Sequence, residues 1–101
     1  MKKNWGYLKN MEMHDMICDE LFEKKSVAAF IWLISQGREL EAVYDGQSFF
    51  ITSDKSKEKV SLWINKEEKS FETIEDLVQF GEIKGKKIID IWNEVNLETL
   101  F

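Results

Sequence analysis

Alternation of apolar and polar residues predicts most elements of this chain. Residues 11–25 form an amphipathic pattern, with Asn10 as a plausible N-cap. Its apolar positions are Met13, Met16, Ile17 and Leu21. Residues 27–34 have no polar face, and Ser26 before them and Gly37 after them are typical of a helix start and end. Because a helix that is apolar all round must be covered on both sides, we expect it between the first helix and a sheet.

The clearest local signal is a hairpin within residues 39–52. Asp45-Gly46 separates two strand-like runs, and this dipeptide favours a type I′ turn. A two-residue loop pairs Tyr44 with Gln47 and fixes the register of both strands. That register places five side chains on one buried face: Leu40, Ala42, Tyr44, Phe49 and Ile51.

A third strand is predicted over residues 60–65, where Val60, Leu62 and Ile64 alternate with polar or outward residues. Trp63 then shares the outer, mostly polar face of the sheet with Phe50. Neither ring has an obvious place in the core, unless another element covers them.

The last third of the chain predicts two helices. Thr73 with Asp76 resembles a capping box for a short helix that Gly81 ends. After a turn at Gly85, residues 86–95 predict a second helix. The whole chain, residues 1–101, is therefore expected to be a single α+β domain. We expect two N-terminal helices, a three-stranded antiparallel meander and two C-terminal helices packed on one sheet face.

Several short patterns resemble a known family. The run from Gln36 to Glu41 precedes the hairpin, Phe71 precedes the capped helix, and residues 91–95 read Ile-Trp-Asn-Glu-Val. This order resembles short uncharacterised proteins of Gram-positive bacteria and their phages, which carry no assigned activity. The resemblance spans about residues 27–96, so residues 26–101 form the expected core and residues 1–25 an arm and helix outside it. It implies this fold and a phage or mobile-element setting, and no catalytic residues.

Composition narrows the classes of function. The 14 lysines and arginines against 19 acids give a charge of −5, which argues against nucleic acid and anionic lipid as partners. The longest apolar run, Val27 to Ile34, is too short for a membrane span, and the N-terminus lacks the apolar stretch of a signal peptide. A lone cysteine, Cys18, fits a reducing compartment, so we expect a cytoplasmic protein.

His14 and Cys18 are candidates for chemistry because they lie four residues apart on one face of the first predicted helix. They could supply half of a metal site completed across a symmetric dimer, or a nucleophile and its base. The chain has one cysteine and one histidine, and we identify no orienting third group. We therefore expect Cys18 to pack and His14 to be exposed, and we predict no catalytic residue, metal or cofactor.

Lysine-bearing loops offer a nucleic-acid-binding alternative. A basic patch would form if the loop after the second strand and the second glycine turn meet, with Trp63 available to stack on a base. The lysines concerned are Lys55, Lys57, Lys59, Lys84, Lys86 and Lys87. A solvated loop and a solvated helix N-terminus are the simpler interpretation, and we favour it.

The preferred prediction is a non-enzymatic module that binds another protein or itself. Its interaction residues are Trp63 and Phe50, together with Trp5 and Tyr7 of the N-terminal arm. Exposed aromatic side chains are enriched at binding interfaces. The arm could instead fold back over Phe50 and Trp63, which would make a self-contained monomer.

Overall fold

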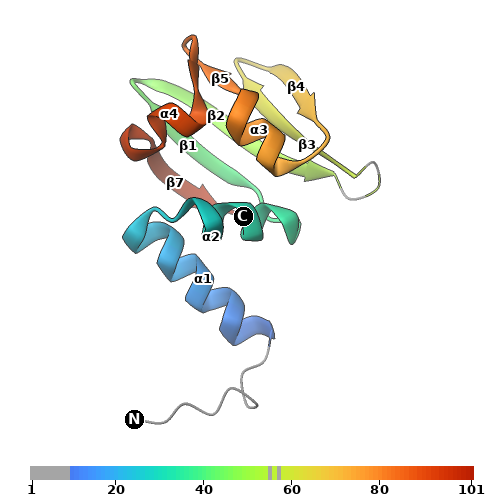
Figure 1. The fold of residues 1–101 in the computed structure, drawn as a ribbon, viewed down its shortest axis with the longest axis vertical. Coiled ribbons are helices and arrows are strands. Elements are labelled where there is room, and N and C mark those ends of the chain that lie inside the picture. The colour runs from blue at the N-terminus through green and yellow to red at the C-terminus, as the bar shows by residue number, and fades with distance from the viewer. Residues whose placement is uncertain (1–9, 55, 57) are drawn as a thin grey trace.

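The computed structural model describes residues 10–54, 56 and 58–101, with side chains from Met13 onward (Figure 1). The helices are α1 (Asn10–Lys24), α2 (Val27–Ser35), α3 (Ile74–Phe80) and α4 (Ile88–Ile91), followed by the 3₁₀ turn η2 (Trp92–Glu94). The strands are β1 (Leu40–Tyr44), β2 (Gln47–Asp54), β3 (Lys59–Ile64), β4 (Glu67–Phe71), β5 (Glu82–Ile83), β6 (Lys86–Lys87) and β7 (Asn96–Leu100).

Five of these strands form one antiparallel sheet in the order β4-β3-β2-β1-β7, and β5 pairs with β6 in a separate ribbon. Helices α3 and α4 lie in front of the sheet in Figure 1, and α1 extends away from it beyond α2. The predicted α+β class is confirmed. The three-stranded meander is too small, because β4 and β7 extend it at both edges.

The β1–β2 hairpin has the predicted register. Asp45 and Gly46 have φ angles of 47° and 79°, as a type I′ turn requires. Tyr44 pairs with Gln47, and the five side chains predicted to face inward are all buried. Phe50 of β2 pairs with Trp63 of β3, so both rings share the outer face, as predicted.

Helix α2 begins and ends where its flanking residues predict. The Ser26 hydroxyl accepts a hydrogen bond from the Ala29 N–H at 3.1 Å. At the other end Gly37 has a φ of 92°, and its N–H donates to the Ile34 carbonyl at 2.9 Å. The Arg38 N–H donates to the Leu33 carbonyl at 3.1 Å, which completes a Schellman motif. α2 lies between α1 and the sheet, as expected (Figure 1).

Strand β4 was not predicted, because its sequence Glu-Glu-Lys-Ser-Phe shows no apolar alternation. It is an edge strand with a single neighbour, β3, and its charged side chains discourage pairing with other chains. The turn before it consists of Asn65 and Lys66, whose φ angles are 51° and 69°. This two-residue turn is again of the I′ kind, formed here without glycine.

The helix predicted over residues 86–95 is wrong in its extent. Lys84 and Gly85 have φ angles of 54° and 79° and form a tight turn, so Lys86 and Lys87 pair with β5 instead of starting a helix. Only Ile88–Ile91 is α-helical, and η2 follows. Ile88, Ile91 and Trp92 are buried and have the spacing of a helix. One α-helical turn followed by a 3₁₀ turn is enough to place all three on the same side.

Strand β7 forms at the C-terminal tail, where no strand is predicted. Leu97 and Leu100 both pack against the core although they are three residues apart. A β-bulge explains this spacing, because Ala42 pairs with Leu97 whereas Glu41 pairs with Thr99.

Helix α1 buries less of its apolar face than predicted. Leu21 is fully buried and Ile17 packs against the core, but Met13 and Met16 are 44% and 40% exposed. α1 lies chiefly against one element, α2, so only a narrow stripe of its surface is covered. The capping role of the Asn10 side chain lies outside the described residues.

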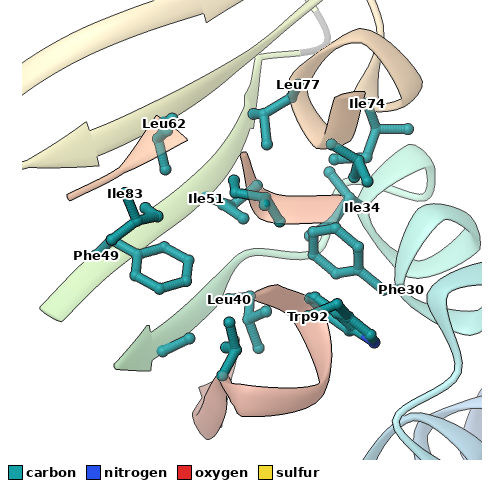
Figure 2. Packing of buried hydrophobic residues seen from close by; sticks show 14 of the residues in the cluster. Phe30, Ile34, Leu40, Phe49, Ile51, Leu62, Ile74, Leu77, Ile83 and Trp92 are labelled. Atoms are coloured by element: carbon teal, nitrogen blue, oxygen red, sulfur yellow. The ribbon is translucent and has the colours of Figure 1, made fainter. Parts of the chain in front are cut away.

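Trp92 lies beside Phe30 in the core (Figure 2). The centroids of the Trp92 and Phe30 rings lie 4.8 Å apart. The indole N–H of Trp92 donates to the Lys25 carbonyl at 2.6 Å. The Lys25 ammonium lies 5.9 Å from the Trp92 ring and donates to the Val95 carbonyl. Burial lowers the pKa of Lys25 below its ordinary value. Two hydrogen bonds, one donated by Trp92 and one by Lys25, thus join the α1–α2 turn to the segment before β7.

We predict that Trp92→Phe lowers the free energy of unfolding by about 1–3 kcal/mol, because the Lys25 carbonyl loses a buried donor. Trp63→Phe is the matched control, since Trp63 is only half-buried and water can replace its bond to Thr52, so its loss costs less than about 1 kcal/mol. Urea unfolding followed by circular dichroism measures both values. Equal losses would contradict this role of Trp92.

Candidate functional site

The outer face of the sheet carries one continuous row of side chains across five strands. Strand register places Thr99 beside Glu41, Glu41 beside Phe50, Phe50 beside Trp63, and Trp63 beside Glu68. Two aromatic rings therefore lie side by side at the centre of the sheet, with a carboxylate on either side. Phe50 is 40% exposed, whereas its neighbour Phe49, on the inner face, is 1% exposed.

Trp63 lies between two hollows of this face. Its indole N–H donates to the Thr52 hydroxyl at 3.0 Å, which fixes the ring across strands β2 and β3. One hollow, of about 450 Å³, is lined by Phe50 and by residues near the β1–β2 and β3–β4 turns. The other, of about 620 Å³, extends toward the end of α2 and includes Glu39 and Glu68. The ring thus contributes to both hollows.

Glu68 is oriented by a buried hydroxyl. Ser61 is 6% exposed, and its hydroxyl donates to the Glu68 carboxylate at 2.5 Å, a short charge-assisted bond. The Ser70 hydroxyl lies 3.3 Å from that of Ser61. Sequence reasoning missed Glu68, because β4 itself was not predicted.

The larger hollow is acidic. Every charged residue that lines it is an acid: Glu39, Asp54 and Glu68. Among the residues that the structure describes, no salt bridge compensates Glu39, Glu41 or Glu68. Arg38 is next to Glu39 in the chain, but its guanidinium is bonded elsewhere, to His14 and the carbonyls of Leu100 and Phe101.

His14 and Cys18 come together on α1, with Cys18 Sγ 3.6 Å from His14 Nδ1. Arg38 Nη1 lies 2.6 Å from His14 Nε2, and a guanidinium only donates, so this nitrogen accepts. The His14 ring lies 5.9 Å from that of Trp32 and is half-buried rather than exposed, whereas Cys18 packs as expected. Within the described part of the chain, no group of three or more ligand side chains could hold a metal ion.

Among the described lysines of the predicted basic patch, Lys59 lies apart from Lys84. Lys84 bonds Asp45 at 3.2 Å, at the start of β2, whereas Lys59 pairs with Asp54 at the other end of that strand. The length of β2 places these ends about 25 Å apart. Lys55 and Lys57 lie outside the described residues, as do Trp5 and Tyr7 of the arm.

Comparison with protein-family models, with curated proteins and with solved structures found no match. The resemblance to short proteins of Gram-positive bacteria and their phages therefore stays a prediction. Across the described ranges 10–54, 56 and 58–101, none of the helices combines the length and apolar character that a membrane span needs.

We predict that the Cys18 thiol reacts slowly with alkylating agents. Burial, the largest effect, raises its pKa above the ordinary 9.0, and Asp15 and Asp19 add to this, while Arg38 acts in the opposite direction. The thiolate fraction at neutral pH is therefore small, and alkylation is slow. The rate of iodoacetamide reaction between neutral and alkaline pH, with the urea-unfolded chain as control, measures this. A folded-state midpoint below that of the unfolded chain would revive the nucleophile hypothesis.

Proposed function

We propose that the chain is a non-enzymatic module that binds another protein through the outer face of its sheet. The observation that supports this most is Phe50, a large apolar side chain 40% exposed at the centre of a five-stranded sheet. Antiparallel sheets with one solvated face carry polar residues there. An aromatic pair in that position is typical of an interface.

The shape of this face supports binding as well. Hollows lie on both sides of Trp63, and aromatic side chains seated beside pockets are the usual centres of protein interfaces. The row Glu41-Phe50-Trp63-Glu68 lies on four neighbouring strands, so its geometry is held by the sheet instead of by a loop.

Other parts of the proposal rest on the sequence. A lone, partly buried cysteine and the charge of −5 support a cytoplasmic module. The phage or mobile-element setting rests on the family resemblance. Trp5 and Tyr7 remain candidate contributors to the interface.

The rival functions gain less support. Nucleic-acid binding needs cations gathered on one surface, and Lys59 and Lys84 lie at opposite ends of β2. A metal centre or an enzyme at His14 and Cys18 needs further ligands or an activated thiol. There Arg38 occupies a histidine nitrogen, and burial raises the pKa of Cys18.

Binders selected from a random peptide library test the proposed face. We expect Phe50→Ser to weaken the selected peptides at least about tenfold, because the residue lies at the centre of the interface. Phe80→Ser is the matched control: Phe80 is 58% exposed on α3, and its loss leaves binding unchanged. Fluorescence anisotropy measures affinity, and circular dichroism confirms folding. Binders that tolerate Phe50→Ser but not Phe80→Ser would place the interface elsewhere.

A further inference from the structure

We propose that the outer sheet face takes a cationic segment of its protein partner, with an arginine or lysine side chain seated between Trp63, Glu39 and Glu68. This inference rests on the proposed function and names the chemistry of the partner. Four features of the described residues carry it: the sign of the charges, their lack of counter-ions, the aromatic ring between them and their spacing.

The sign of the charge is uniform around the larger hollow. Glu39 directly precedes β1 and Glu68 lies on β4. Both side chains line the hollow beside Trp63. No described lysine or arginine lines this hollow, and the nearest arginine in sequence, Arg38, is bonded to His14 and to the C-terminal carbonyls. A bound cation would therefore meet Glu39 and Glu68, two carboxylates without a salt bridge to any described lysine, arginine or histidine.

Glu68 is oriented in advance for such a contact. The Ser61 hydroxyl holds one of its oxygens, Oε2, at 2.5 Å, and Ser61 is itself buried. A carboxylate that is already fixed loses less side-chain entropy when it binds a cation. The second oxygen can accept from a guanidinium or ammonium.

The aromatic pair favours the same partner. The face of a tryptophan ring attracts arginine and lysine, and guanidinium groups also stack on it. The indole N–H of Trp63 is already satisfied by Thr52, so the ring does not require a hydrogen-bond acceptor from the partner. Phe50, beside it, offers apolar contact to the stem of a cationic side chain or to an apolar neighbour.

The distance between Glu41 and Glu68 leaves room for a second cationic side chain of the partner. Glu41 and Glu68 are separated by three strand intervals, or roughly 14 Å. In an extended segment, side chains four residues apart lie on one face at about this distance. A segment with cations at these two positions and an apolar residue midway between them matches the row Glu41-Phe50-Trp63-Glu68.

The same charges disfavour two other occupants. A second copy docked face to face would bring the acidic face that carries Glu39, Glu41 and Glu68 against an identical acidic face, and like charges repel. A nucleic acid would bring phosphates to the same carboxylates.

A charge series of peptides tests the proposal. The probe is a short fluorescein-labelled peptide in which arginine and leucine alternate with serine, and its two counterparts carry glutamate or glutamine in place of arginine. We expect the arginine peptide to bind at least about tenfold more tightly than the glutamate peptide, and more weakly as salt is raised. Glu39→Gln with Glu68→Gln weakens the arginine peptide about fivefold.

Matched controls separate local contacts from net charge. Glu75→Gln with Glu82→Gln removes the same two charges from exposed positions on α3 and β5, and we expect less than about a twofold effect. Equal losses in the two double variants would overturn the proposed seat at Glu39 and Glu68. Failure of the arginine peptide to bind more tightly than the glutamate peptide, or to bind at all, would overturn the cationic partner.

The same experiments distinguish a wrong docking face from a wrong partner chemistry. If the glutamine peptide binds as well as the arginine peptide and Phe50→Ser abolishes both, the docking face stands and its cationic partner does not. If Phe50→Ser leaves the binding of every peptide unchanged, the docking face itself is wrong. A dimer in sedimentation that Phe50→Ser dissociates would show that a second copy occupies the face, and would also overturn the inference.

Discussion

The two-residue turn at Asp45-Gly46 is the constraint on which the rest of the structure depends. Its positive φ angles fix which residues of β1 and β2 face each other. Since side chains alternate between the faces of a strand, a slip of one residue would turn Phe49 outward and Phe50 inward. The buried set of the hairpin and the outer row of Glu41 and Phe50 are therefore two consequences of the same register.

Covering the sheet on one side makes the outer face available. α2, α3 and α4 supply the inner layer, and the hydrogen bonds of Trp92 and Lys25 join the α1–α2 turn to the segment before β7. The second hairpin, at Asn65-Lys66, then brings Glu68 beside Trp63. The acidic and aromatic row thus combines residues distant in sequence, and the sheet gives it a rigid support.

Sequence alone predicts the parts of the fold that short-range patterns determine. The Ser26 cap, the Gly37 helix end and the hairpin at Gly46 all follow from local backbone preferences. The edges of the sheet do not, because β4 is polar and its turn lacks glycine, and because a bulge breaks the alternation of β7. At the candidate site the pairing of Phe50 with Trp63 is predictable. The carboxylate of Glu68 is not, because its strand shows no apolar alternation and the turn before it lacks glycine.

Phe49 and Phe50 provide the most direct test of the central claim, since they are adjacent in β2 and face opposite sides of the sheet. The measurement is the broadening of their ring proton signals by a soluble paramagnetic agent, in the isolated chain. The account predicts strong broadening for Phe50 and little for Phe49. Equal protection of both rings would show that the outer face is covered, and equal broadening would show that the register or the one-sided core is wrong.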